Sequence, residues 1–367
     1  MTTVAVIGLG TMGLGIAQTY AAAGFAVLAT DAVPAARETA LARLRESLGP
    51  RVAAGKLAQT DLDALIDRIT VVSGPEAMAA ADLAIEAVVE KIEVKRALFT
   101  ALEAVVAPDA VLATNTSSLS VAAMAEGLAH PERLLGLHFF NPAPVMKLVE
   151  LVAQPATSDA ALGRARRLTE AAGKTVIACP DRPGFIVNRC ARPFYGEALA
   201  ILEEGRSASD IDAAMLAAGY RLGPFALIDL IGADINLAAT ESLAAAMGNH
   251  PRYHVFEALR RQVASGDLGR KTGSGFLHPA LPGPAPADAG TIAARIEAAL
   301  VNEAGWLLSE GGTTREGIDT ALKFGLNFPR GPFEIGGTPR ATLAALAAAA
   351  PPHLRGRYDP APGLERP

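Results

Sequence analysis

The 367-residue sequence contains few aromatic residues, only two cysteines and no excess of basic charge. Its net charge of −5 argues against nucleic acid as a partner. It contains no run of about 18 uncharged apolar residues, so no membrane span or membrane partner is predicted. Cys179 and Cys190 have neither the spacing of a disulfide framework nor that of a metal site. We therefore expect two reduced, buried, structural thiols and no metal.

Half of the residues are hydrophobic and 19% are charged, which excludes disorder as the main state. Because aromatic residues make up only 5%, the core has to be built from Ala, Leu, Val and Ile. The length predicts two or three domains. The first basic residue is Arg37, and the chain opens directly into a strand-like run. We therefore expect no targeting segment and a cytoplasmic location.

Short Val- and Ile-rich runs alternate with helical patterns over residues 1–182. This alternation predicts an α/β domain with a doubly wound, mostly parallel, Rossmann-like sheet. The predicted strands are Thr3–Gly8, Phe25–Thr30, Ile69–Val72, Leu83–Ala87, Val111–Ala113, Leu134–His138, Lys147–Val152 and Thr175–Ala178. The clearest helical patterns are Leu14–Ala23, the long region Pro34–Arg68, Glu93–Val106 and Asp159–Ala172.

Strand-like runs vanish after residue 182, so residues 183–280 are predicted to form an all-helical domain, followed by a Pro- and Gly-rich linker at 281–290. The segment that begins at Ile201 then has an echo that begins at Leu307. Three pairs match at offsets of 106 to 108 residues: Gly205 with Gly311, Asp212 with Asp319, and Gly223 with Gly331. This favours a partial second helical repeat over 291–345 and a tail at 346–367. Chance similarity between two Ala-rich helices is the alternative.

Gly8, Gly10 and Gly13 form G-x-G-x-x-G between a predicted strand and a predicted helix. Glycine at these positions permits the tight turn, the approach of a pyrophosphate and close helix packing, and the helix N-terminus favours phosphate. Asp31 ends the second predicted strand, where a carboxylate would bind a ribose 2′-hydroxyl and favour NAD over NADP. A purely structural turn with an unrelated surface aspartate is the alternative.

Oxidation of an alcohol by NAD requires a base, and histidine has a suitable pKa. Of the six histidines, His138 ends a predicted strand of the sheet domain, and the carboxyl ends of such strands line the ligand crevice. Glu150 lies in the next apolar run, where it could orient the imidazole. Asn115 and Ser117 follow another strand and would face the same crevice or cap the next helix. Asn188 lies at the domain junction and could face the cleft.

Taken together, seven ordered motifs resemble the L-3-hydroxyacyl-CoA dehydrogenase family over nearly the whole chain. They are GLGTMGLGIA, IEAVVEKIEVK, NTSSLS, GLHFFNPAPVMKLVELV, PGFIVNR, GPFALIDLIGADIN and GDLGRKTGSGF. The resemblance implies interconversion of a (S)-3-hydroxyacyl-CoA and a 3-oxoacyl-CoA, with NAD as the cofactor. Because an apolar helical domain commonly buries its excess apolar face against a partner, we also expect a homodimer.

The same resemblance implies roles for individual residues. His138 resembles the catalytic base and Glu150 its orienting carboxylate, while Ser117 and Asn188 resemble the groups that bind the substrate's hydroxyl and thioester carbonyl. The helical region Pro34–Arg68 resembles an arm over CoA, in which Lys56 is a candidate for a CoA phosphate or a solvated helix lysine. The residues that resemble cofactor contacts are Gly8, Gly10, Thr11, Met12, Gly13, Asp31, Glu90, Lys95, Asn115, Ser117 and Lys271.

The second repeat resembles that of longer bacterial 3-hydroxybutyryl- and 3-hydroxyadipyl-CoA dehydrogenases. Nothing in it is seen to match the PGFIVNR segment, so no second copy of Asn188 is expected. Two classes of alternative stay open. One is a dehydrogenase of a free hydroxy acid, either of the 6-phosphogluconate-related type or of the gulonate dehydrogenase and lens-crystallin type. The other is a non-catalytic NADH-binding structural protein.

Overall fold

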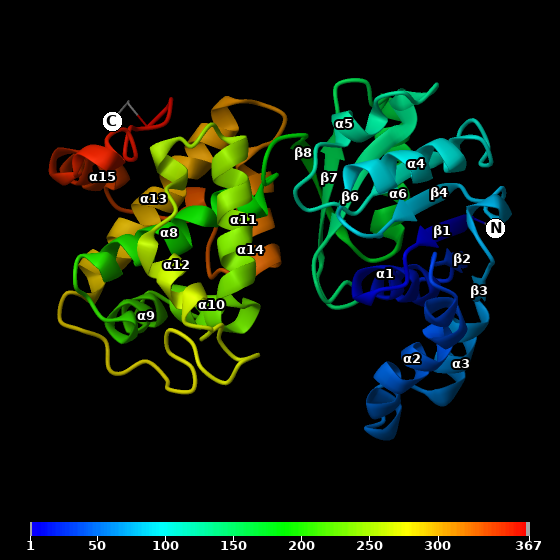
Figure 1. Ribbon diagram of the computed structural model, residues 1–367, viewed down its shortest axis with the longest axis horizontal. Coiled ribbons are helices and arrows are strands. Elements are labelled where there is room, and N and C mark those ends of the chain that lie inside the picture. Colours follow the sequence, from blue (N-terminus) through cyan, green and yellow to red (C-terminus); the bar gives the residue numbers. More distant parts are fainter. Residues whose placement is uncertain (1, 365–367) are drawn as a thin grey trace. The chain divides into compact units, whose positions relative to one another are not determined.

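The chain divides into two compact units, Met1–Arg182 and Pro183–Pro367 (Figure 1). The computed structural model describes residues 2–364. Among these residues no helix combines the length and the apolar character needed to cross a membrane. Both cysteines are buried, as the sequence predicts.

The first unit is built on one eight-stranded sheet with the order β3-β2-β1-β4-β5-β6-β7-β8. Neighbouring strands are parallel except β6 and β7, which are antiparallel. The strands are β1 (Thr3–Ile7), β2 (Ala26–Thr30), β3 (Ile69–Val71), β4 (Leu83–Glu86), β5 (Val111–Thr114), β6 (Leu134–Phe139), β7 (Leu148–Ala153) and β8 (Thr175–Pro180). The predicted doubly wound, mostly parallel sheet is therefore confirmed, with strand ends within a few residues of the prediction.

The helices between these strands range from five residues (α5) to 20 residues (α2) in length. They are α1 (Thr11–Ala22), α2 (Pro34–Ala53), α3 (Gln59–Asp67), α4 (Ile92–Glu103), α5 (Val121–Ala125) and α6 (Asp159–Ala171), with 3₁₀ turns η1 (Pro75–Ala77) and η2 (Pro131–Arg133). The long helical region predicted at Pro34–Arg68 is thus two helices, broken near Gly55, whose φ of +67° favours glycine.

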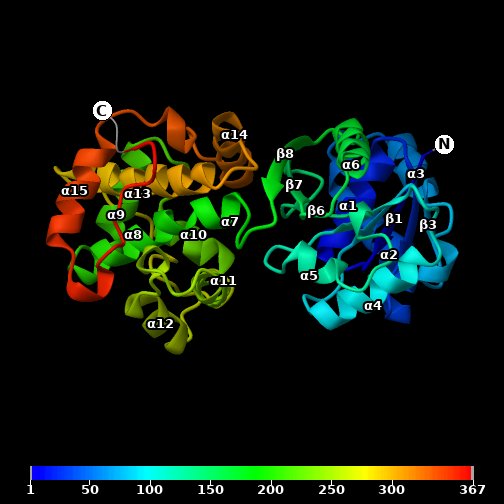
Figure 2. The same ribbon diagram turned by 90° about the horizontal axis from the view of Figure 1, so that it is seen from above.

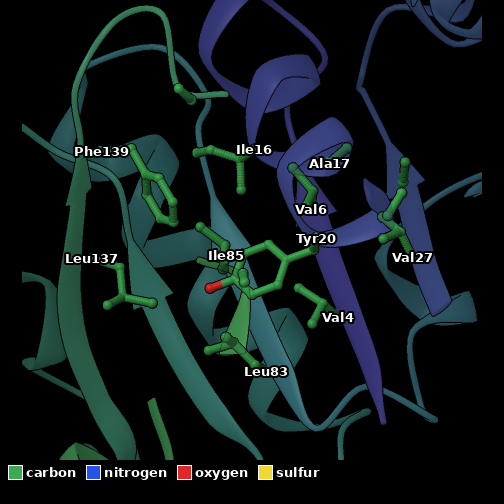
Figure 3. Close-up of a cluster of buried hydrophobic side chains, with 14 of the residues drawn as sticks. Val4, Val6, Ile16, Ala17, Tyr20, Val27, Leu83, Ile85, Leu137 and Phe139 are labelled. Atoms are coloured by element: carbon green, nitrogen blue, oxygen red, sulfur yellow. The ribbon is translucent and has the colours of Figure 1, made fainter. Parts of the chain in front are cut away.

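The core of this unit is mainly aliphatic, as the scarcity of aromatic residues requires. Tyr20 of α1 is an exception, and Figure 3 shows its ring among side chains of β1 and β4. Its hydroxyl lies 2.9 Å from the Thr169 hydroxyl of α6, which satisfies a fully buried polar group. This packing fixes α1 against the sheet and thereby fixes the glycine-rich turn from which α1 begins.

The second unit is helical. Its helices are α7 (Val187–Cys190), α8 (Arg192–Glu203), α9 (Ala208–Ala217), α10 (Pro224–Ile231), α11 (Ala233–Ala246), α12 (Glu257–Ala264), α13 (Ala289–Ser309), α14 (Arg315–Leu326) and α15 (Pro339–Ala349), with 3₁₀ turns η3 (Pro251–Tyr253), η4 (Pro332–Glu334) and η5 (Pro352–Leu354). Over the described part of this unit, strand-like pairing is limited to an isolated bridge between Gly269 and Ser274.

The sequence echo corresponds to repeated local structure. Asp212 of α9 accepts the backbone N–H groups of Phe225 and Ala226, and so caps α10. Asp319 of α14 accepts the N–H of Phe333 in the same way. In both copies a Cβ on the glycine before the proline would collide with the aspartate, at 2.2 Å for Gly223 and for Gly331. Glycine and aspartate therefore recur together because the cap has no room for a Cβ beside the aspartate.

Two arginines join the copies reciprocally, one fully buried (Arg189) and one partly exposed (Arg295). Arg189 of α7 binds Glu303 through Nε at 2.7 Å, and its Nη atoms bind Glu310 at 2.7 and 2.8 Å. Arg295 of α13 binds Glu197 through Nε at 2.8 Å, and its Nη atoms bind Glu204 at 2.6 and 2.8 Å. Figure 2 shows α13 alongside α8, and the two helices are in contact.

The members of these two sets occupy equivalent positions. An offset of 106 residues separates the members of each pair: Arg189 and Arg295, Glu197 and Glu303, and Glu204 and Glu310. The expectation that nothing matches PGFIVNR is therefore wrong at three of its seven positions, because Gly290, Ile292 and Arg295 are the identical counterparts of Gly184, Ile186 and Arg189. It holds for Asn188, whose counterpart is Ala294. Three scattered identities in seven residues are too few to recognise without the carboxylates that both arginines bind.

The described elements do not stop at the predicted limits of the repeat. Helix α13 begins at Ala289, inside the segment predicted as a linker at 281–290, and α15 runs to Ala349, past the limit at residue 345. Part of the predicted tail is packed into the unit: Arg357 and Tyr358 are buried and both bind Glu197. Arg357 and Tyr358 thus bind Glu197 as Arg252 and Tyr253 bind Glu303 in the other copy.

Candidate active site

The glycine-rich turn connects β1 to α1. A Cβ on Gly8, whose φ is +100°, would lie 2.4 Å from the carbonyl oxygen of Ala87, and a Cβ on Gly13 would lie 1.8 Å from that of Gly8. These two glycines are therefore required by the fold itself. Gly10 differs, because a Cβ there would meet no protein atom within 4 Å. It caps α1 without a side chain, which leaves the first N–H groups of the helix open to an anion.

Asp31 follows β2 and closes this turn. Its Oδ2 accepts the N–H of Leu9 at 2.7 Å, and its Oδ1 accepts the N–H of Val33 at 2.8 Å. Each carboxylate oxygen can accept a second hydrogen bond. The aspartate thus holds the turn in place while it keeps the acceptor capacity that a ribose hydroxyl requires.

Strands β1, β4, β5 and β6 are consecutive in the sheet and parallel, so their carboxyl ends share one edge. The glycine-rich turn, the segment after β4, the Asn115 loop and the end of β6 all lie at that edge. Ligands of open α/β sheets bind at the carboxyl ends of the strands. Residues far apart in the sequence are therefore brought to one place by strand order alone.

His138 and Glu150 are direct partners across the antiparallel strands β6 and β7. His138 Nδ1 lies 2.6 Å from Glu150 Oε2, and the glutamate side chain is fully buried. Because an ionised carboxylate can only accept, Nδ1 carries the proton in this hydrogen bond. The other ring nitrogen, Nε2, is then the one with a lone pair for a proton from a ligand. The predicted pair is present.

The loop Asn115–Ser118 is held from both sides. Asn115 Oδ1 accepts the N–H of Phe139, the residue after His138, at 2.8 Å, which ties the loop to β6. On the other side, Glu90 accepts the Thr116 hydroxyl, the Ser117 N–H at 3.2 Å and the Ser118 hydroxyl at 3.2 Å. The Asn115 side chain therefore ties this loop to the strand that carries His138.

Lys95 is buried beneath this loop, where it bridges Glu86 at 2.7 Å and Glu90 at 2.9 Å. Burial by itself would raise the pKa of Glu90, but the hydrogen bond from Thr116 and the charge of Lys95 outweigh it, so the pKa is lowered. Glu90 is therefore a carboxylate at neutral pH, and its bonds to the loop are charge-assisted.

Sequence reasoning did not single out Glu86 or Thr114. Both are fully buried, and the Thr114 hydroxyl and Lys95 bind the two oxygens of Glu86 at 2.7 Å each. A glutamate at the end of the apolar run that forms β4 was the available signal, because carboxylates are rarely buried without a partner.

Comparison with protein families decides what this arrangement belongs to. The model described as "3-hydroxyacyl-CoA dehydrogenase, NAD binding domain" matches residues 3–182. The model described as "3-hydroxyacyl-CoA dehydrogenase, C-terminal domain" matches residues 184–278 and 290–347. The chain belongs to the 3-hydroxyacyl-CoA dehydrogenase family. Its members are NAD-dependent oxidoreductases, so this chain is an enzyme of that class with NAD as its cofactor.

Individual members of the 3-hydroxyacyl-CoA dehydrogenase family are similar over different lengths. The 3-hydroxyadipyl-CoA dehydrogenase of Escherichia coli is 46% identical over 74% of this chain, and the match spans 58% of that relative, less than two thirds of its length. The 3-hydroxybutyryl-CoA dehydrogenase of Clostridioides difficile is 38% identical over 74% of this chain and 97% of its own. A crystal structure of 3-hydroxybutyryl-CoA dehydrogenase from E. coli covers 99% of this chain, with 33% identity and a TM-score of 0.91.

Three further predicted residues are Lys56 in the first unit and Asn188 and Lys271 in the second. Lys56 is exposed at the break between α2 and α3. Asn188 lies half-buried on α7 of the second unit. Lys271, also in the second unit, forms an ion pair with Asp234 next to Gly232.

Proposed function

We propose that this chain interconverts a (S)-3-hydroxyacyl-CoA and a 3-oxoacyl-CoA with His138 as the proton-transferring residue and Glu150 as its orienting partner. The observation that carries this proposal is the buried His138–Glu150 hydrogen bond of 2.6 Å at the sheet edge that also holds the glycine-rich turn. Such a pair is suited to move a proton to and from a hydroxyl group.

NAD fits the residues of the first unit. The open space at Gly10 and the uncapped N–H groups of Thr11 and Met12 suit a pyrophosphate, and Asp31 suits a ribose. The residues we propose as cofactor contacts are Gly8, Gly10, Thr11, Met12, Gly13, Asp31, Glu90, Lys95, Asn115, Ser117 and Lys271. Lys95 is buried between two carboxylates, which supports an indirect part for it: it holds Glu90 in place. Bound NAD⁺ supplies the hydride acceptor.

In the oxidative direction, His138 accepts the proton of the substrate hydroxyl at Nε2 as its Nδ1–H donates to Glu150. The imidazolium that results is stabilised by the glutamate charge, which cannot move away because it is fully buried. In the reverse direction His138 returns the proton to the oxygen. We propose that Ser117 and Asn188 hold the hydroxyl and the thioester carbonyl, and that Lys56 binds a CoA phosphate.

The names of the relatives point to short acyl groups, hydroxybutyryl or hydroxyadipyl, and we propose a substrate of this class. We also propose that the enzyme is cytoplasmic and forms a homodimer. A panel of 3-oxoacyl-CoAs of rising length, with and without a terminal carboxylate, tests the substrate class through the steady-state oxidation of NADH. Light scattering of the purified chain tests whether it forms a homodimer.

The His138→Gln variant tests the proposed reaction. Because glutamine cannot exchange a proton, we expect turnover of acetoacetyl-CoA with NADH to fall by about three orders of magnitude. NADH absorbance measures turnover, and NADH fluorescence measures cofactor binding, which we expect to be unchanged.

His130→Gln is the matched control, since His130 also contacts a glutamate, Glu132 at 3.2 Å, but lies exposed. Its turnover should equal that of the wild type. Near-wild-type turnover of His138→Gln would refute the proposed role, and a wild-type chain that binds NADH without oxidising it would favour a structural protein.

A further inference from the structure

The helix that carries Asn188 is too short to hold itself. Helix α7 has four residues, Val187–Cys190, and one or two turns of helix are not stable alone. The chain enters it through Gly184 and Phe185, whose φ angles of +75° and +48° are those of a sharp turn. Its apolar residues are buried, but apolar contacts are non-directional and do not by themselves fix the rotation of a helix.

Arg189 fixes the rotation of α7. Its guanidinium is fully buried, and all three of its nitrogens bind carboxylates of α13 and its C-cap: Nε binds Glu303 of the helix, and the two Nη atoms bind the C-cap residue Glu310. A planar guanidinium bound in this way has one allowed orientation. Helix α13 and the following helix α14 both contact α7. The residue next to Asn188 is therefore locked to the second repeat.

Comparison of the two copies shows what is particular to the Arg189 contact. Arg295 is held by Glu197 and Glu204 with the same geometry, but the residue before it is Ala294, which is exposed. The residue before Arg189 is Asn188, which is polar and half-buried. The two copies thus share one structural device, and only one copy places a hydrogen-bonding side chain beside it.

We propose that Glu303 and Glu310 of the second repeat are positioning residues that act through Arg189 on Asn188. The proposal rests on the proposed function, in which Asn188 binds the acyl-CoA. The second repeat then has no chemistry of its own, but it determines how well the first repeat holds the substrate. Misplacement of a binding group by about 1 Å can lower a rate about 100-fold, so a small rotation of α7 is sufficient.

Glu310→Gln and Glu204→Gln form a matched pair for the test. Each removes the charge from the carboxylate that binds two Nη atoms, and both side chains are partly exposed, so neither leaves a buried charge wholly without a partner. Fluorescence of Trp306, the only tryptophan, reports the unfolding of the second unit in both variants. Steady-state kinetics with acetoacetyl-CoA and NADH supply kcat and KM.

We expect Glu310→Gln to lower kcat/KM for acetoacetyl-CoA about 10-fold with an unchanged Kd for NADH. Glu204→Gln should lower the unfolding temperature equally and leave kcat/KM at the wild-type value. Glu310→Asp, which keeps the charge, should restore most of the loss. Equal kinetic losses in the two glutamine variants would overturn the proposal, since both would then report stability alone.

A double-mutant cycle with Asn188→Ala tests the route of the effect. If Glu310 acts through Asn188, Glu310→Gln should cause no further loss of kcat/KM in the Asn188→Ala background. A full 10-fold loss in that background would overturn the proposal, although the reaction assigned to His138 would stand. Wild-type kinetics of Asn188→Ala would refute both the role of Asn188 and its positioning by Glu310. An inactive wild-type chain would refute the proposed function itself.

Discussion

At Gly10 and Gly13 the same added methyl group has opposite consequences. The Cβ of Gly13 would overlap the carbonyl oxygen of Gly8, whereas that of Gly10 would extend into space without protein atoms. The φ of −68° at Gly10 is one that alanine adopts freely. One glycine of the motif is therefore kept for the fold, and the other for what binds beside it.

Gly10→Ala is accordingly expected to keep the wild-type unfolding temperature and to weaken NADH binding about 10-fold or more, because the methyl group occupies the proposed pyrophosphate site. Gly13→Ala is expected to lower the unfolding temperature itself. Thermal unfolding and NADH fluorescence titration measure the two effects. Gly49→Ala in α2, where a Cβ also has open space, is the control and should leave NADH binding unchanged. Wild-type NADH affinity of Gly10→Ala would contradict this role.

Among the secondary-structure elements, α10 depends on a side chain that lies outside it. Its N-cap is Gly223, which has no side chain to accept a hydrogen bond, so Asp212 of α9 takes that part. Burial raises the pKa of Asp212 to about 7, although the N–H groups of Phe225 and Ala226 favour the charged form. The nearby carboxylate of Asp229 adds to the rise.

This raised pKa predicts a pH dependence. Because the folded state binds the proton of Asp212 more tightly than the unfolded state does, the free energy of unfolding falls as pH rises from about 4 to about 7. The contribution is fully present below pH 3.8 and amounts to about 4 kcal/mol at most. Unfolding followed by Trp306 fluorescence should show this slope in the wild type and lack it in Asp212→Asn. Asp210→Asn, in the same helix, should keep the slope; parallel slopes for wild type and Asp212→Asn would contradict the prediction.

On the scale of the whole molecule, the second repeat supplies charges that the first cannot do without. Arg189 and Glu197 are fully buried, and their partners Glu303, Arg295 and Arg357 all lie beyond residue 290. The match to the C. difficile relative spans 97% of that protein but only 74% of this chain. A shorter family member therefore exists, and its equivalent surface has to be covered in another way.

A chain cut after Ala280 is expected to unfold at a much lower temperature than the full chain, since breaking a buried ion pair costs about 3–5 kcal/mol. Because only another molecule could then cover Arg189 and Glu197, its unfolding temperature should rise with protein concentration. Circular dichroism at two concentrations, with the full chain as the control, measures both effects. An unfolding temperature equal to that of the full chain and independent of concentration would contradict this view.

Local patterns determined most of the first unit. Alternation of apolar and polar residues, glycine punctuation and the G-x-G-x-x-G context located the strands, the parallel sheet and the turn at Gly8–Gly13, because each depends on residues within a few positions of one another. The motifs likewise determined the family. His138 and Glu150 could be paired from sequence because they lie on successive strands, where register brings side chains together.

Only the tertiary structure decided the contacts between distant segments. The ion pairs of Lys95 with Glu86 and Glu90, and the tie from Asn115 to β6, depend on strand order. The reciprocal pairing of Arg189 and Arg295 depends on how two repeats pack, and the two arginines are recognised as equivalent only once their carboxylates are found. The sequence alone thus determined the elements and the family to which the chain belongs. Packing decided which buried charges meet, because a buried charge is stable only beside a partner that the local sequence does not contain.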